Sequence, residues 1–324
     1  MFDIFVSLFA GLELCYYLLI TQTGIVEAYH SDLAAIALLP LGGIVGTFMI
    51  PSIKAKAQPT TLLLLSLQNA LTLLYPHFGA FWLFMLGIAV GGLAPLIVAT
   101  LREARPYALF IALALSYATG TLLFTYDPLE RRFLGMLLGM GAIIFYVLAL
   151  FFHRTHKKSA SISYPLWTMF VWVFLDSALF ETLSRDTVIP IWREGYTLPI
   201  VLFHILGVTA GIFGKWNAQQ KSLVIYLLFA LSYLFYFTQE SLLLSMAYPF
   251  VISLYNVAIL QSLMAQNDAK KVSFTMVVVC WVASGAGLFV ALHHLVALMP
   301  FLLVLEVATQ TLTTFFYTTK RRLV

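Results

Sequence analysis

Charged side chains are scarce along this chain. Lys, Arg, Asp and Glu make up only 10% of the 324 residues, whereas soluble domains carry about 25%. Hydrophobic residues reach 61% and the mean hydropathy is +0.94. A water-soluble fold could not bury so much apolar surface, so the composition excludes a soluble protein and indicates a membrane protein.

Long polar segments are missing too, and this leaves no room for a soluble catalytic or nucleotide-binding domain. The run of residues 211–216, GIFGKW, lacks the spacing and the Ser or Thr after Lys that a phosphate-binding loop needs. The N-terminus has no basic region before its first apolar run, so we expect that run to be a retained span. Cys15 and Cys280 fall inside apolar runs, which predicts small buried side chains.

What the chain has is a succession of apolar runs long enough to cross a membrane. Continuous runs such as residues 62–65 predict helices, because strands of a membrane β-barrel alternate apolar and polar residues. We therefore expect an all-α polytopic membrane protein with about 12 transmembrane helices. The spans are predicted near residues 3–25, 33–53, 60–76, 79–101, 106–125, 132–152, 164–184, 197–215, 221–238, 241–264, 272–293 and 296–318.

The basic residues predict an orientation, because Lys and Arg in short loops are retained on the cytoplasmic side. With an N-terminus inside, 14 of the 18 Lys and Arg fall in cytoplasmic segments and four in outer loops, namely Arg131, Arg132, Arg185 and Arg193. We expect a protein of the inner membrane with both termini cytoplasmic. The net charge of +4 then indicates attraction to the anionic inner leaflet and not to nucleic acid.

An internal repeat divides the chain into two similar halves. At an offset of 165 residues, 118–124 match 283–289, 102–105 match 267–270, and 45–48 match 210–213. Three matches at one offset predict two six-helix halves of the same orientation, related by an axis along the membrane normal. We expect Gly120 and Gly285 to lie at equivalent close helix contacts.

The halves are predicted to be joined by a basic, serine-rich linker near the middle of the chain. The domain prediction is a first six-helix bundle over residues 1–153, a cytoplasmic linker over 154–163 and a second six-helix bundle over 164–324.

The fourth span carries a family resemblance. Residues 87–95, GIAVGGLAP, precede the basic segment REARP at 102–106. A Gly-rich, Pro-ended fourth helix leading into a basic loop resembles the major facilitator superfamily (MFS) of secondary transporters, over essentially the whole chain. The loop after the second span departs from the family pattern, because residues 46–56 keep the glycine and the basic residues but have no acid. The resemblance implies two pseudo-symmetric bundles around a central cavity lined by the first and fourth helix of each half.

Four acids lie inside predicted spans, where an ionisable group costs about 2.5 to 3.5 kcal/mol on insertion scales. Glu13 and Asp176 fall at matching depths of spans one and seven, so we expect them to bind a proton or a cation. Tyr17, His204 and Asn256 are the expected supporting contacts. The other two acids have different expected roles: a gate or interface for Glu181, and a bond to a neighbouring helix for Glu306.

The absence of Lys and Arg from the spans argues against anionic substrates. We therefore expect a proton-coupled secondary transporter that moves a small cationic or neutral molecule across the inner membrane by alternating access. The 15% of aromatic residues would supply cation–π surfaces. The protein is expected to act as a monomer in the lipid bilayer, with a small molecule or ion as substrate and the proton as coupling ion. We expect it to bind no cofactor, no metal and no nucleic acid and to have no enzymatic activity.

Two alternatives stay open. A copper-type metal importer of the same superfamily would use thioether ligands, and Met136 and Met140 stand one helical turn apart in span six. A non-transporting protein is the other alternative, either an assembly factor of a respiratory complex or an integral membrane enzyme. An enzyme would need clustered carboxylates or a set of metal-binding histidines near one surface, and only the pair His293 and His294 comes close to this.

Overall fold

The structure, a computed structural model, describes residues 1–29, 36–50, 56–152, 163–185, 188–192 and 195–309. All regular elements in these ranges are helices, which confirms the all-α prediction. Eight helices of the described chain are long and apolar enough to cross a membrane. Four shorter helices occupy the remaining predicted spans, so twelve helical segments match the predicted number.

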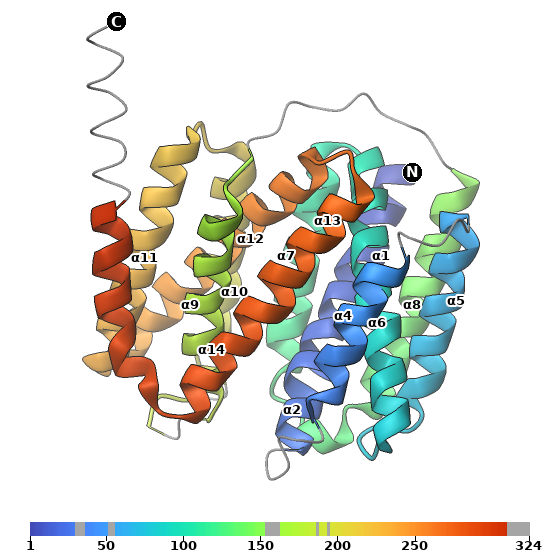
Figure 1. The fold of residues 1–324 in the computed structure, drawn as a ribbon, viewed down its shortest axis with the longest axis horizontal. Helices are drawn as coiled ribbons and strands as arrows, with labels where there is room; N and C mark the ends of the chain where they lie inside the picture. The colour runs from blue at the N-terminus through green and yellow to red at the C-terminus, as the bar shows by residue number, and fades with distance from the viewer. Residues whose placement is uncertain (30–35, 51–55, 153–162, 186–187, 193–194, 310–324) are drawn as a thin grey trace, which may run out of the picture.

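The first half begins with one long helix, Phe2–Ala28, and continues with five more segments (Figure 1). The long helix comprises an α-helical part, a π-helical part and a last α-helical turn. The elements of this half are α1 (Phe2–Tyr16), η1 (Tyr17–Gly24), α2 (Ile25–Ala28), α4 (Leu38–Met49), α5 (Ala57–Thr72), α6 (Ala80–Glu103), α7 (Pro106–Leu123), the 3-10 turn η3 (Pro128–Glu130) and α8 (Arg132–Phe151).

The second half repeats this order, and its eleventh span again contains a π-helical part. Its elements are α9 (Leu166–Arg185), α10 (Thr197–Phe213), α11 (Ala218–Phe237), α12 (Ser241–Ala265), α13 (Ala269–Met276), η4 (Val277–Val282), α14 (Ala283–Leu292), η5 (Leu295–Leu298) and the rest of a last apolar helix, Leu295–Thr309. The predicted linker lies outside the described residues except for Ser163, so its boundaries stay a prediction.

Local sequence signals explain where several helices begin. Asn217 starts α11 with a capping box: its Oδ1 accepts from the Gln220 backbone N–H at 2.8 Å while the Gln220 side chain accepts from the Asn217 N–H. Asp268 caps α13 by accepting from the Lys270 N–H at 2.9 Å. Pro106 occupies the first turn of α7, where its missing N–H costs no hydrogen bond. These starts fix the short turns that separate the spans.

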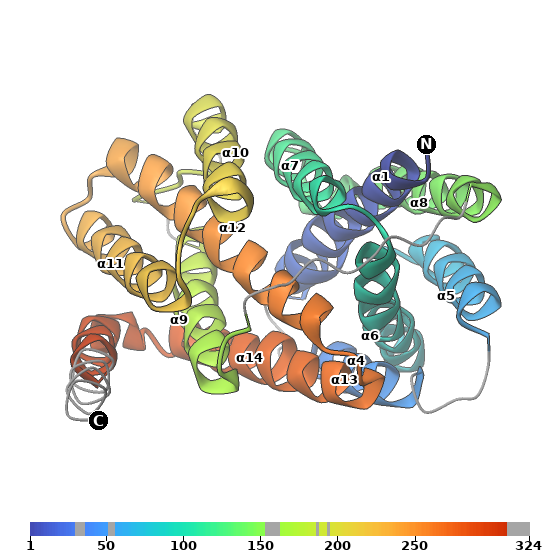
Figure 2. The ribbon, with the colours of Figure 1, turned by 90° about the horizontal axis from the view of Figure 1, so that it is seen from above.

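Helix contacts follow the same scheme in both halves. In the first half α4 packs on α6, α1 on α7 and α5 on α6; in the second half α10 packs on α12, α9 on α14 and α11 on α12. Between the halves, α7 meets α10 on one side and α4 meets α13 and η4 on the other (Figure 2). Each of these named contacts has a counterpart six spans later, as two repeats around an axis along the membrane normal require.

Glycines allow the tightest of these contacts. A Cβ on Gly46 of α4 would collide with the backbone oxygen of Ile88, and one on Gly91 of α6 with that of Gly43. At the equivalent crossing in the second half, a Cβ on Gly207 would collide with the Phe250 carbonyl. Backbones can approach this closely only where small residues face each other. The offset of 165 residues pairs Gly42 with Gly207 and Gly46 with Gly211.

The prediction for Gly120 and Gly285 was wrong in part. A Cβ on Gly120 would lie 2.9 Å from the Leu18 side chain, so this glycine is at a helix contact. Apart from its own helix backbone and chain neighbours, no atom of the described residues lies within 4 Å of a Cβ built on Gly285. The close contact of α14 is instead at Gly287, whose Cβ would approach the Ala178 backbone N at 2.7 Å. A sequence match locates equivalent turns of a helix but does not say which side faces a neighbour.

Candidate functional site: a cavity between the halves

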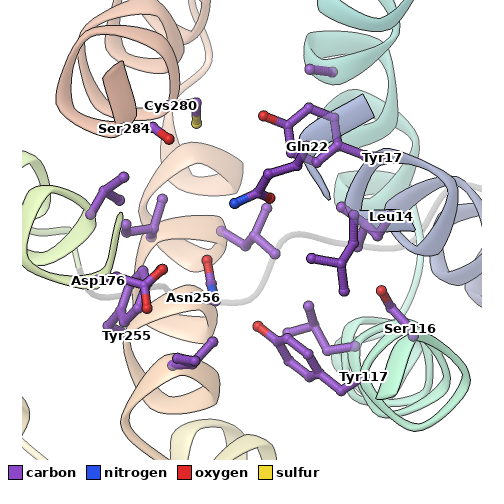
Figure 3. Close-up of a pocket in the computed structure, with 18 of the residues that line it drawn as sticks. Leu14, Tyr17, Gln22, Ser116, Tyr117, Asp176, Tyr255, Asn256, Cys280 and Ser284 are labelled. Carbon is purple, nitrogen blue, oxygen red and sulfur yellow. The ribbon is translucent and has the colours of Figure 1, made fainter. Parts of the chain in front are cut away.

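A cavity of about 290 Å³ lies between the two halves. Its walls come from α1, η1, α6 and α7 of the first half and from α9, α10, α12 and the α13–η4–α14 span of the second. Most lining side chains are apolar or aromatic, with a few polar groups among them (Figure 3). The volume is at the lower end of the range of about 300 to 1,000 Å³ found for small-molecule pockets. The cavity therefore suits a small ligand.

The structure places all five predicted site residues in the wall of this one cavity. The first half contributes Glu13 and Tyr17, and the second half contributes Asp176, His204 and Asn256. Their positions agree with the expected geometry, while their roles in binding stay predictions.

Glu13 is almost completely enclosed, with a relative exposure of 2%. Its Oε2 accepts one hydrogen bond, at 3.0 Å, from Nε2 of Gln68, a fully buried residue of α5 behind the cavity wall. Oε1 of Gln68 has no partner within the described parts of the chain. The hydroxyl of Tyr16, three residues further along the chain, hydrogen-bonds with Thr72, with 2.7 Å between the two hydroxyl oxygens.

Asp176 has a different environment, because two tyrosines of α12 hold its carboxyl group. The Tyr248 hydroxyl donates to Oδ1 at 2.8 Å and the Tyr255 hydroxyl donates to Oδ2 at 2.7 Å. The two tyrosines are seven residues apart, about two helical turns, and so lie on one face of α12. Asp176 itself is partly accessible. Its carboxyl group is thus fixed in position while remaining in contact with the cavity.

Tyr17 and Asn256 belong to opposite walls (Figure 3). The Tyr17 ring, at the start of η1, meets the Trp281 ring edge-on with 6.4 Å between centroids. Asn256 follows Tyr255 on α12 and lies in the same wall, and Tyr117 of α7 is on the facing wall. Trp281 donates from Nε1 to Thr47 Oγ1 at 3.2 Å, which links η4 to α4 of the other half.

His204 lies where α10 meets α7. Its Nδ1 is 2.8 Å from the Ser253 hydroxyl of α12, and its ring stacks on Tyr117 of α7 with 4.2 Å between centroids and 3° between planes. The histidine is buried, with 3% exposure. It therefore joins the two halves through a stacking contact beside the cavity.

The remaining two acids of the spans are paired outside the cavity wall. Glu181 forms an ion pair with Arg185 one turn further along α9, at 2.7 Å. Glu306 accepts hydrogen bonds from Tyr226 at 3.2 Å and from Trp167 at 3.4 Å, and so bridges the last helix to two neighbours. This is the helix-bonding position expected for Glu306.

No Lys or Arg is among the described residues that line the cavity, and Glu13 and Asp176 are its acids. Met136 and Met140 of α8 are not part of the lining either. No group of three or more His, Cys, Asp or Glu that could hold a metal ion occurs in the described ranges. The two carboxylates of the lining favour a proton or a cation, and the methionine pair on which the copper alternative depended lies outside the cavity wall, although Met276 and Cys280 are part of the lining.

Tyr117, Trp192 and Trp281 are among the aromatic residues of the wall that sequence reasoning missed. Trp192 follows α9 in a connecting segment, so no helical period could place it; it packs against Phe124 and His204 at 6.1 and 6.5 Å between centroids. Tyr248 was missed as a partner of Asp176. The seven-residue spacing of Tyr248 and Tyr255 was the available signal.

Comparison with known proteins identifies the class of fold. At the sequence level, no family model and no curated protein matches the chain. Among solved structures, the fold is that of MFS transporters, which confirms the predicted architecture. A crystal structure of the MFS transporter FucP in the outward conformation is similar over 94% of this chain and 98% of its own, with a TM-score of 0.58 and 12% identity. At this identity the likeness shows the fold.

Proposed function

We propose that this protein is a proton-coupled secondary transporter that moves a small cationic or neutral molecule across the inner membrane by alternating access. One observation carries the proposal. Glu13 and Asp176, from the first helix of each repeat, line a single cavity between the halves that has no Lys or Arg among its described lining residues. Ionisable groups inside a membrane protein normally mark substrate or proton pathways.

The proposed mechanism is a rocking of the two halves around this cavity. The halves meet along α7–α10 on one side and α4–α13–η4 on the other, through side-chain contacts such as Tyr117 on His204 and Trp281 on Thr47. Within each half, backbone-to-backbone glycine contacts make α4 and α6, or α10 and α12, move together. Tight contacts within halves and side-chain contacts between them favour rigid-body motion of each half.

The basic residues support a cytoplasmic N-terminus. Of the described Lys and Arg, seven lie at the face where α1 begins, namely Lys56, Arg102, Arg105, Lys215, Lys221, Lys270 and Lys271, and three lie at the opposite face, namely Arg131, Arg132 and Arg185. Positive residues in short loops are retained inside the cell.

The test uses proteoliposomes with a pH-sensitive dye trapped inside. A panel of organic amines, neutral alcohols and carboxylates is added outside at a fixed pH gradient. We expect at least one amine or neutral compound to drive a proton flux, and carboxylates to drive none. Glu13→Gln and Asp176→Asn should each remove the flux, whereas Glu306→Gln, which alters an acid outside the cavity wall, should retain it. Unchanged proton coupling in both cavity variants would remove the proposed roles.

A further inference from the structure

The two cavity acids differ in what surrounds them, and this difference indicates a division of roles. Glu13 is 2% exposed and receives a single amide hydrogen bond. Asp176 is partly accessible and receives two tyrosine hydroxyl hydrogen bonds, one on each oxygen. Hydrogen bonds donated to a carboxylate stabilise its charged form. The two hydroxyl hydrogen bonds therefore favour the ionised form of Asp176 more than the single amide hydrogen bond favours that of Glu13, and the Asp176 carboxyl group is held at the cavity.

The Asp176 carboxylate also keeps unused acceptor capacity. An ionised carboxylate offers about four lone-pair positions, and Tyr248 and Tyr255 occupy one on each oxygen. Figure 3 shows Asp176 and Tyr255 on one wall, Asn256 beside them, and Tyr117 on the facing wall. An ammonium group carries three N–H donors in a compact head. It can donate to Asp176 and to the oxygens of Asn256 or Tyr117.

The rest of the cavity suits the body of an organic cation. Aromatic rings of the lining, among them Tyr17, Tyr117, Trp192 and Trp281, can contact the cationic head through their faces. Apolar side chains of α6 and α12 form much of the remaining wall, among them Val90, Val98 and Ile259. A charged head on an apolar body matches this distribution better than a molecule that is polar throughout.

We infer that the cavity binds an organic cation of the protonated-amine class, with the ammonium group on Asp176 between Tyr248, Tyr255 and Asn256 and the apolar body against the α6 and α12 walls. This inference rests on the proposed function and narrows its substrate class from cationic or neutral to cationic. No described Lys or Arg of the lining competes for the carboxylate.

The test uses two sets of ligands. The members of each set have nearly the same shape and differ in charge, being cationic, neutral or anionic. Phenethylamine, phenethyl alcohol and phenylacetate form one set, and hexylamine, hexanol and hexanoate another. Binding to the full chain in nanodiscs is measured by isothermal titration calorimetry at neutral pH. We expect at least one amine to bind about 10-fold or more tightly than its alcohol, because a charge-assisted hydrogen bond is roughly twice as strong as a neutral one. The carboxylates should not bind.

Variants of Asp176 then test the site. Asp176→Asn should bring the amine affinity down to that of the alcohol, and Asp176→Glu should restore part of the preference because it restores the charge. Glu306→Gln is the matched control, since this acid bonds Tyr226 and Trp167 away from the cavity, and should bind amines as the natural chain does. Size-exclusion profiles and melting temperatures confirm that each variant is folded.

The outcomes separate the inference from the proposed function. Alcohols binding as tightly as amines, no amine binding at all, or an unchanged amine preference in folded Asp176→Asn would overturn the inference. If a neutral compound drives proton flux in proteoliposomes while amines do not, the inference fails and the transporter proposal stands. If amines bind through Asp176 but no compound drives proton flux, the inference about the site stands and the transport proposal fails.

Discussion

At the scale of single residues, the chain contains a buried arginine that donates hydrogen bonds to the first span. Arg131 is 1% exposed and lies at the start of α8. Its guanidinium donates to the backbone oxygens of Tyr126, Leu19 and Phe124 at 3.1, 3.2 and 2.8 Å and to the Thr23 hydroxyl at 2.9 Å. Leu19 and Thr23 belong to η1, whose π-helical turn also carries Tyr17 and Gln22 into the cavity wall.

Replacing this arginine should therefore destabilise the protein. Arg131→Ala leaves several buried acceptors without a donor, and we expect a loss on the order of 3 kcal/mol, since one unsatisfied buried group costs about 1 to 3 kcal/mol. Arg131→Lys should be intermediate, because one ammonium cannot reach acceptors on both sides as the planar guanidinium does. Arg132→Ala, at the exposed neighbouring position, is the control. Melting in detergent measures the effect, and equal melting temperatures for Arg131→Ala and Arg132→Ala would contradict this account.

Asp176 shows what a sequence can and cannot reveal about a residue. An acid within an apolar run is unfavourable in a membrane and normally has a function there. Glu13 and Asp176 could therefore both be chosen from the sequence. The tyrosines that hold Asp176 are on another helix, more than seventy residues further on. Only tertiary packing brings them together, and no local pattern around position 176 encodes them.

At the scale of elements, the glycines of α4 and α10 explain how each half stays rigid. The Gly46 Cβ would meet the Ile88 carbonyl and the Gly92 backbone N, the latter at 2.9 Å. The equivalent Cβ on Gly211 would meet the Val257 side chain at 2.9 and 3.0 Å. The overlap at Gly46 is with backbone atoms of α6 and is the deeper of the two, whereas the overlap at Gly211 is with one side chain of α12 and is shallower.

Alanine substitutions at these glycines should destabilise the protein in the order of these overlaps, with Gly46 above Gly211. We expect Gly46→Ala to cost about 1 to 3 kcal/mol through overpacking against α6, and Gly211→Ala to cost less. Gly285→Ala should be neutral, because no atom of the described residues lies within 4 Å of its added Cβ apart from its own helix backbone and chain neighbours. Thermal melting of the three variants side by side gives the comparison. A Gly285→Ala variant as damaged as Gly46→Ala would show that α14 packs differently.

The spans themselves were the most predictable elements, because an apolar run of the right length in lipid has few alternatives to a helix. Gly87 and Gly91 of α6 lie at the contact with α4, a pairing that the sequence did not predict. The π-helical turns η1 and η4 were not, although both carry cavity residues, Tyr17 in one and Trp281 in the other. Such a turn depends on the hydrogen bonds available nearby, for example those that Arg131 makes to η1, and leaves no periodic signal in the sequence.

At the scale of the whole molecule, the repeat explains the position of the cavity. Each half places its first helix in the wall of the cavity between the halves, and the two carboxyl groups come from these helices, α1 and α9. The asymmetry lies in the partners: a buried amide for Glu13 and two tyrosines for Asp176. We expect the two similar halves to provide the rocking motion. The different surroundings of the two acids are expected to separate proton binding at Glu13 from substrate binding at Asp176.

The central claim is that the halves rock so that the cavity opens to each face in turn. Double electron–electron resonance measures this directly on spin-labelled pairs, in a chain in which Cys15 and Cys280 are replaced by Ala. Lys56→Cys with Lys270→Cys reports the face where α1 begins, and Thr125→Cys with Thr238→Cys reports the opposite face; all four positions are exposed. When pH is lowered or phenethylamine is added, one distance should lengthen while the other shortens. Distances that stay fixed at both faces, or that change in the same direction, would contradict alternating access.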